Sequence, residues 1–355
     1  MSSAAGSRIP AIDGLRAIAI LVVMGVHAAP DALPGGFWGV DLFFVISGYL
    51  ITGQLKAEWD AAGRIDWPAF LRRRFFRIWP AFTVLLAIAL IASFAPGLES
   101  YRWSVLVALF SLTNWASVVL GADFGGALRH TWSLSAEEQF YLIWPALLVL
   151  GGLLSRPRQL AMVLLFLTLA TTAWRILLFT QGADGSRLYN GLDTHNEGLL
   201  LGCAIALWAP KWRRAIAERL WIVSGAVLAA ALFGVVAHSL FNLTAGLLVL
   251  AACAAVLLMA VLEHLPGLGW LEHAWLAALG RRSYSLYLFH LPIFECMQHT
   301  GLQPQLSLAV AIGVSFLAAE LSYRFVERPF LTRPTPRLAS PGPDFQAAAA
   351  PRYEP

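Results

Sequence analysis

Charged residues are scarce in this sequence of 355 residues. Asp, Glu, Lys and Arg together make up 13% of the chain, whereas 58% of its residues are hydrophobic. Because soluble domains carry about 25% charged residues, roughly half of the usual charged surface is missing. This composition excludes an ordinary soluble protein, and it leaves no room for a separate soluble domain of ordinary size.

Cysteines are few, and the common nucleotide and metal signatures are absent. Cys203, Cys253 and Cys296 all lie in apolar stretches, which argues against a disulfide framework or a thiolate metal site. The sequence contains no Walker loop, no GxGxxG loop and no His or Cys pair at metal-ligand spacing. We therefore expect no bound metal, no nucleotide hydrolysis and no nucleic-acid partner.

Long apolar stretches, by contrast, follow one another along nearly the whole chain. A membrane-spanning helix needs about 20 mostly apolar residues. Eleven segments approach that length: residues 11–29, 36–55, 78–95, 103–121, 138–154, 160–180, 194–209, 220–238, 241–262, 276–298 and 305–326. The predicted fold class is all-α, a polytopic transmembrane helix bundle over residues 1–330. Residues 331–355 are rich in Pro and Ala and are expected to form a disordered cytoplasmic tail.

The basic residues of the short loops predict how the helices cross the membrane, because such loops stay in the cytoplasm. The basic clusters lie at residues 56–77, 156–158, 211–219, 281–282 and 328–337. An even number of crossings must separate consecutive clusters, but three apolar segments lie between Arg77 and Arg156. One of these three is therefore expected to be re-entrant or buried. The result is about ten spanning helices in the inner (plasma) membrane, with both termini cytoplasmic.

Two ionisable residues share one face of the first apolar segment. Arg16 and His27 are eleven residues apart, which is close to three helical turns and about 16 Å along the axis. Ionisable side chains inside a membrane span are costly and mark functional sites. An imidazole near a carboxylate is a natural general base for a hydroxyl group at neutral pH. Arg16 could equally pair with Asp13 as an interfacial anchor.

A basic cluster precedes the third apolar segment. Arg74 and Arg77 share a helix face at i, i+3, and Arg73 and Arg77 do so at i, i+4. A fork of guanidinium groups binds phosphate. Basic residues at a cytoplasmic interface also bind anionic lipids, so the spacing alone supports both interpretations equally.

Carboxylates stand at the start of two apolar segments. Asp41 enters a strongly apolar helix, so it should have a partner inside the bundle, either in a structural salt bridge or in catalysis. Glu137 and Glu138 are expected at the outer start of the helix 138–154, at the same membrane depth as His27. Because adjacent helical residues point about 100° apart, only one of the two glutamates should face a site. Further candidates are His195, Asn196, Glu197 and His290.

Six motifs, in this order along the chain, resemble those of the membrane acyltransferase-3 family. They are DGLRA at 13–17, GVDLFFVISGY at 39–49, RRFFRIWP at 73–80, WSLSAEEQF at 132–140, SYSLYLFH at 283–290 and ERP at 327–329. The resemblance covers roughly residues 9–331, and the ordered set is specific although each motif alone is not. The chain departs from the family at 195–197, where it has HNE in place of a frequent Arg-x-Asp pattern.

The resemblance implies an enzyme, namely an acyltransferase that transfers groups other than aminoacyl groups. The family O-acylates surface polysaccharides, peptidoglycan, Nod factors and macrolides. The expected reaction moves an acyl group, most often acetyl, from acyl-CoA to a hydroxyl of a carbohydrate or glycosylated acceptor, in contact with membrane lipids. The expected catalytic residues are His27, Glu137, Glu138 and Asp41, and the expected donor-binding residues are Arg16, Arg73, Arg74 and Arg77.

The expected mechanism connects the two faces of the membrane. The guanidinium groups hold the CoA phosphates on the cytoplasmic side, and the pantetheine arm carries the thioester toward His27. His27 removes the hydroxyl proton of the acceptor, oriented by Glu137 or Asp41 as the third group of a triad-like arrangement. A covalent acyl-histidine intermediate is the alternative.

Two other classes of function fit part of the sequence. A transporter would also bury ionisable residues near the membrane midplane, but it should show paired broken helices in an inverted repeat, and no repeat is visible. A lipid-binding scaffold would explain the arginine cluster but not His27 together with the glutamates.

Overall fold

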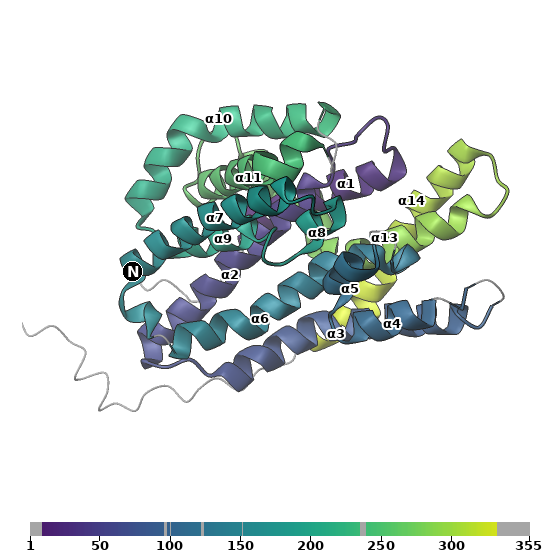
Figure 1. The fold of residues 1–355 in the computed structure, drawn as a ribbon, viewed down its shortest axis with the longest axis horizontal. Helices are drawn as coiled ribbons and strands as arrows, with labels where there is room; N and C mark the ends of the chain where they lie inside the picture. Colours follow the sequence, from purple (N-terminus) through teal and green to yellow (C-terminus); the bar gives the residue numbers. More distant parts are fainter. Residues whose placement is uncertain are drawn as a thin grey trace, which may run out of the picture.

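The computed structural model describes residues 9–331, except for 96–97, 100, 122–123, 151 and 235–238. All regular elements in these residues are helices, and most of them run along the longest axis of the molecule (Figure 1). The all-α prediction is therefore confirmed. The predicted tail, apart from its first residue, lies outside the described residues.

Seven helices in the described residues are long and apolar enough to cross a membrane, which identifies a multi-pass membrane protein. This count is lower than the expected ten. Five of the seven are α1 (Pro10–Ala28), α2 (Trp38–Ala62), α3 (Trp67–Ala92), α7 (Pro157–Thr180) and α10 (Pro210–Gly234). The sixth joins the π-helical turn η3 (Asn242–Gly246) to α11 (Leu247–Leu262), and the seventh joins α14 (Pro304–Leu321), η5 (Ser322–Glu327) and α15 (Arg328–Leu331).

Shorter or more polar helices complete the bundle. Three of them coincide with predicted spans: α6 (Trp132–Leu150), α9 (Glu197–Leu207) and α13 (Ser283–Gln298). The remaining helices connect these elements: α4 (Tyr101–Leu109), α5 (Thr113–Leu120), η1 (Gly126–Thr131), η2 (Leu153–Ser155), α8 (Gly185–Asn190), η4 (Gly269–Glu272) and α12 (Ala274–Arg281).

The apolar stretch at 103–121 does not form one helix. It divides into α4 and α5, and Ser111 between them has a left-handed backbone with a φ of 54°. The Ser111 hydroxyl donates a hydrogen bond to the Glu138 carboxylate on α6. Neither half approaches the roughly 20 residues that a spanning helix needs. This divided stretch lies between Arg77 and Arg156, where the distribution of basic loops predicts one segment that does not cross.

Glycines bring α2 and α9 into close contact. A Cβ atom added at Gly48 would lie 2.1 Å from the carbonyl oxygen of Leu199, and one at Gly202 would lie 2.2 Å from that of Val45. Small residues allow two membrane helices to approach closely. This contact places the start of α9 beside Asp41 on α2.

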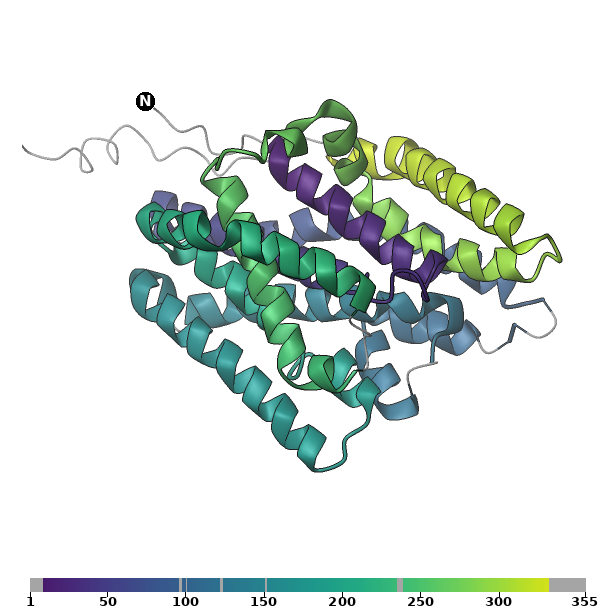
Figure 2. The same cartoon turned by 90° about the horizontal axis from the view of Figure 1, so that it is seen from above.

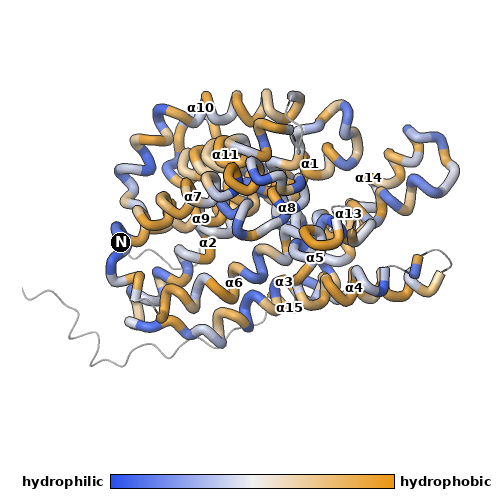
Figure 3. Tube along the Cα trace, in the orientation of Figure 1, coloured by the Kyte–Doolittle hydropathy of each residue, from blue (hydrophilic) through white to orange (hydrophobic). Residues whose placement is uncertain are grey.

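Peripheral and more central helices of the bundle differ in how far their side chains are exposed. Large hydrophobic side chains such as Ile91 and Phe325 are 72% exposed, and hydrophobic residues run along the length of the peripheral helices (Figure 3). Such a surface suits contact with lipid chains. By contrast, α1 contacts α2, α12 and α13 (Figure 2), and more than half of its residues are buried. Its outer side remains accessible, because Leu21 is 41% exposed.

Candidate active site

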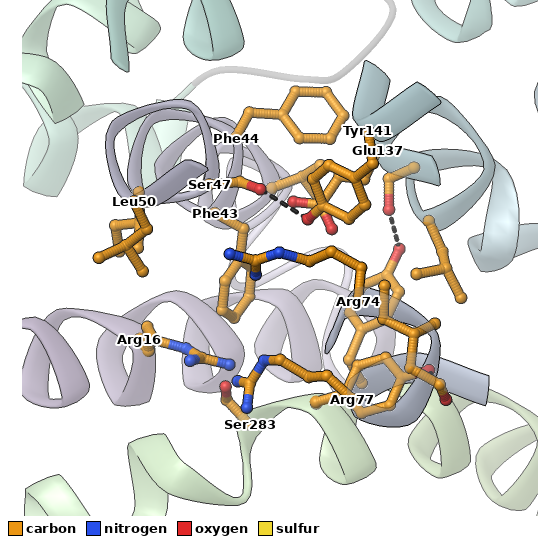
Figure 4. Close-up of a pocket in the computed structure, with 17 residues that line it drawn as sticks. Arg16, Phe43, Phe44, Ser47, Leu50, Arg74, Arg77, Glu137, Tyr141 and Ser283 are labelled. Atoms are coloured by element: carbon orange, nitrogen blue, oxygen red, sulfur yellow. Dashed lines mark hydrogen bonds between the residues drawn. The ribbon is translucent and has the colours of Figure 1, made fainter. Parts of the chain in front are cut away.

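A cavity lies between α1, α2, α3, α6 and α13 (Figure 4). Apolar side chains such as Phe43 and Leu50 form part of its wall. Its polar lining comes from Arg16, Ser47, Arg74, Arg77, Ser133, Glu137, Tyr141, Ser283, Tyr284 and Tyr287. Three of the four predicted donor-binding arginines and one of the two predicted glutamates therefore share one cavity.

The three arginines converge on this cavity from two helices. Arg16 lies on α1, while Arg74 and Arg77 lie one turn apart on α3 (Figure 4). Arg74 donates a hydrogen bond from Nη2 to Oε1 of Gln54 at 2.9 Å, and its guanidinium lies 5.6 Å from the ring centre of Tyr141. Within the described part of the chain, neither Arg16 nor Arg77 forms a salt bridge. The cavity thus concentrates positive charge, which favours an anionic ligand.

Arg73 lies outside this group. It does not line the cavity, and its Nη2 lies 3.3 Å from Oε2 of Glu58 near the end of α2. The helical periodicity explains the difference, because Arg73 points about 100° away from Arg74.

Glu137 and Glu138 have different surroundings, as expected for adjacent residues on a helix. The Glu137 side chain interacts with Ser47 and Tyr141, whose hydroxyl groups are 2.7 Å apart. Glu138 is buried and accepts the hydrogen bond from Ser111 at the break between α4 and α5. Only Glu137 lines the cavity.

His27 lies in a cluster of histidines rather than beside the glutamates. Its ring centre is 5.3 Å from that of His290 on α13, and the His290 ring centre is 5.4 Å from that of His130 in η1. Burial lowers the pKa of His130 well below its ordinary value, and the neighbouring His290 ring lowers it further. His130 is therefore neutral at pH 7.

The position of α6 explains why the glutamates are not near His27. The sequence prediction started this helix at residue 138, but α6 begins at Trp132. Because the observed start is six residues earlier than the predicted one, Glu137 lies about 9 Å further from the start of the helix than expected. Glu137 therefore lies in the second turn of α6, beside Arg16 and Arg74, and His130 occupies the region expected for the glutamates.

Tyr287 connects the cavity to the histidine cluster. It lines the cavity, and its ring centre is 5.3 Å from that of His130 and 5.8 Å from that of His290. Its hydroxyl donates a hydrogen bond to the backbone oxygen of His130 and lies 2.6 Å from the Ser133 hydroxyl. Tyr287 thus belongs both to the lining of the arginine-lined cavity and to the surroundings of the histidine cluster.

Asp41 has the partner that its burial requires. Its Oδ1 atom lies 3.0 Å from Nε2 of His195, and both side chains are fully buried. Nδ1 of His195 donates to the backbone oxygen of Tyr189 at 2.8 Å, and the Trp132 ring stacks on the imidazole. Asp41 therefore contacts His195 and not His27.

Ser47, Gln54 and Tyr141 are cavity or near-cavity residues that sequence reasoning did not select. Tyr141 is four residues after Glu137, so both lie on the same face of α6, and this spacing is a signal that could have identified it. Ser47 and Gln54 carry no such signal, because their positions depend on how α2 packs against α6 and α3. No group of three His, Cys, Asp or Glu side chains in the described residues is arranged to hold a metal ion.

Comparison with known proteins relates the chain to acetyl-transferring proteins. A family described as an acyltransferase domain matches residues 9–323. The chain is 36% identical over 351 residues to the peptidoglycan O-acetyltransferase OatA of Listeria monocytogenes, covering 90% of this chain and 55% of that protein. It is 35% identical over 344 residues to the O-acetyltransferase OatA of Staphylococcus aureus, with 90% and 57% covered. It is 33% identical over 353 residues to the putative peptidoglycan O-acetyltransferase YrhL of Bacillus subtilis, with 92% and 55% covered.

The chain spans about half the length of these relatives. No solved structure matches it.

Proposed function

Since the chain belongs to the acyltransferase-3 family, whose domain spans residues 9–323, we propose that it is an integral membrane O-acyltransferase. It moves an acetyl group from acetyl-CoA to a hydroxyl of a carbohydrate acceptor. Two of the relatives are named as peptidoglycan O-acetyltransferases, so a peptidoglycan sugar is the acceptor that we favour. The observation that carries the proposal is the cavity lined by Arg16, Arg74 and Arg77, which extends to Tyr287 beside the histidine cluster.

The arginine-lined part of the cavity suits the phosphates of CoA. Three guanidinium groups point into it (Figure 4), and none of the three forms a salt bridge among the described residues. Guanidinium groups bind phosphate through paired N–H donors. We assign donor binding to Arg16, Arg74 and Arg77, and we assign Arg73, which pairs with Glu58, to the contact between α2 and α3.

The chemistry takes place at His27. The hydroxyl oxygen of the acceptor attacks the thioester carbonyl, and His27 takes the hydroxyl proton. The C–S bond breaks, and the imidazolium returns the proton to the departing CoA thiolate. Arg16 and His27 lie about 16 Å apart along α1, a separation that the extended pantetheine arm bridges past Ser133 and Tyr287, both of which line the cavity.

The carboxylates have supporting roles in this proposal. Glu137 lies among the arginines, where its charge helps to orient Arg16 and Arg74. Asp41 acts through His195, which fixes the start of α9 against α2. Glu138 holds the break between α4 and α5 through Ser111.

The topology that we propose has ten crossings with both termini cytoplasmic. The seven long helices together with α6, α9 and α13 make ten, and the divided stretch α4–α5 is the segment that does not cross. Every basic cluster then faces the cytoplasm, as the short loops require.

The proposal is tested with the purified protein in lipid nanodiscs. Radiolabelled acetyl-CoA is supplied together with soluble peptidoglycan fragments, and ester-linked label on the sugar is measured. Label transfer that depends on both the protein and the fragments supports the proposal. Absence of transfer together with absence of acetyl-CoA binding contradicts it.

A further inference from the structure

His290 is held in one hydrogen-bonding state by the backbone of its own helix. Its Nδ1 atom lies 3.0 Å from the backbone oxygen of Leu286 and 2.8 Å from that of Tyr287. A carbonyl oxygen only accepts hydrogen bonds, so Nδ1 must carry the hydrogen. In a neutral imidazole, Nε2 is then left as a bare acceptor.

That acceptor is unused within the protein. The His290 side chain is fully buried, and its Nε2 atom has no hydrogen-bond partner among the described residues. A buried polar atom without a partner is unfavourable, and such an atom calls for a functional explanation. The His27 ring is its neighbour, with ring centres 5.3 Å apart and ring planes inclined by 44°.

An imidazole that acts as a general base needs a different contact at each of its two nitrogens. One ring nitrogen must be bare to take the proton, and the N–H of the other must be held by an acceptor that fixes the tautomer and the ring orientation. The carboxylates considered for this second role are engaged elsewhere, because Asp41 contacts His195 and Glu137 lies beside Arg16 and Arg74. The His290 ring lies beside His27, with ring centres 5.3 Å apart, and its Nε2 has no hydrogen-bond partner among the described residues.

The charged groups around this pair are already paired. Arg129 in η1 forms a salt bridge with Glu295 on α13. The other aromatic rings beside His290 are those of His130, Tyr287 and Phe294. Among the described residues, no carboxylate forms a hydrogen bond or a salt bridge with His27 or His290.

We propose that His290 is a positioning residue, whose bare Nε2 accepts a hydrogen bond from the N–H of His27, directly or through one water molecule. This contact turns the other nitrogen of His27 toward the acceptor hydroxyl, and it stabilises the imidazolium that forms when the hydroxyl proton arrives. The proposal rests on the acetyl transfer proposed above. In this arrangement the neutral imidazole of His290 takes the place that a carboxylate has in a Ser-His-Asp triad.

The two nitrogens of His290 can be tested separately. In His290→Asn, the side-chain NH₂ takes the place of Nδ1–H, so the hydrogen bonds to the backbone are kept and the Nε2 acceptor is lost. In His290→Gln, the longer amide places its oxygen near Nε2, so the acceptor is kept. His273→Gln, at an exposed histidine before α12, is the control for replacing a histidine.

The measurement is kcat and the acetyl-CoA KM for transfer to soluble peptidoglycan fragments, with thermal stability recorded for each variant. We expect His290→Asn to lower kcat by about 10²-fold, the lower end of what a positioned general base contributes, with an unchanged KM. His290→Gln should recover at least tenfold of that loss.

Four results would overturn this inference. An His290→Asn protein with the kcat of the wild type would show that Nε2 is not used, and equal losses in the Asn and Gln variants would assign a merely structural role to His290. If instead His27→Ala is fully active, or the wild type transfers no acetyl group, the proposed function itself fails and the inference fails with it.

Discussion

Oδ1 of Asp41 and Nε2 of His195 lie 3.0 Å apart in a pair that the surrounding helices bury completely. Because Nδ1 of His195 donates to a backbone oxygen, the orientation of the imidazole that faces Asp41 is fixed from both sides of the ring. The pair ties α2 to the start of α9, at the place where glycines bring these helices together. Asp41 is thus placed to stabilise the bundle.

Asp41→Ala should therefore lower stability. Removing one partner of a buried pair costs about 3–5 kcal/mol, because Nε2 of His195 is left buried without a hydrogen-bond partner. The midpoint of thermal unfolding in detergent measures this loss, and Asp31→Ala, at an exposed aspartate before α2, is the control. An Asp41→Ala protein that unfolds like the wild type but transfers no acetyl group would assign Asp41 to catalysis instead.

The arginine cavity predicts a difference between neighbouring arginines of α3. Arg77→Lys keeps the charge but loses the paired N–H donors, so the Kd for acetyl-CoA should rise about tenfold, equivalent to about 1.4 kcal/mol. Arg74→Lys should have a similar effect. Isothermal titration with acetyl-CoA measures both.

Arg72→Lys is the matched control, because Arg72 is exposed on the same helix. Arg73→Lys should also bind acetyl-CoA like the wild type, since Arg73 pairs with Glu58 outside the cavity. Unchanged affinity in all four variants would favour the lipid-binding interpretation of the cluster.

Substitutions at the two adjacent glutamates, Glu137 and Glu138, should have different effects. Glu137→Gln removes the carboxyl group that orients Arg16 and Arg74, so it should lower kcat/KM for acetyl-CoA at least about tenfold while the protein stays folded. Glu138→Ala removes the acceptor for Ser111 at the helix break, so it should cost about 1–3 kcal/mol of stability and have less effect on kcat. Thermal unfolding and acetyl transfer, measured on both variants, separate the two roles. The reverse pattern would contradict the assignment of Glu137 to the cavity.

The proposed topology predicts the location of reporters fused to the chain. Reporters placed within 156–158 and after Arg337 should both be cytoplasmic, because an even number of helices separates these positions. A reporter at Gly121, just after α5, should lie outside the cytoplasm, because α3 crosses and α4–α5 does not. A cytoplasmic signal at Gly121, or an external one at either other position, would contradict the ten crossings.

The sequence predicts much of this molecule because composition and spacing determine it directly. Long apolar stretches give helices, and the i, i+3 spacing of Arg74 and Arg77 places both on one helix face. The expected inside partner of Asp41 is present as well, since a buried carboxylate in an apolar helix cannot remain without one.

The rest depends on packing that the sequence does not reveal. The first turns of α6, from Trp132, include polar residues that hydropathy assigns to a loop. Because the helix starts earlier than predicted, Glu137 lies near Arg16 instead of near His27. The break at Ser111 occurs within an apolar stretch, so hydropathy does not detect it. His290 lies 263 positions after His27, and only the contact between α1 and α13 brings the two rings together.

His27→Ala tests the central claim most directly, because the proposed chemistry passes through this imidazole. Acetyl transfer from acetyl-CoA to peptidoglycan fragments is measured in nanodiscs, with acetyl-CoA binding and thermal unfolding as controls. The loss of a general base typically lowers the rate 10²–10⁴-fold, so we expect transfer to fall by at least about 10²-fold. Acetyl-CoA should still bind, because Arg16, Arg74 and Arg77 line the cavity and His27 does not. A folded His27→Ala protein that transfers acetyl groups at near the wild-type rate would contradict the account.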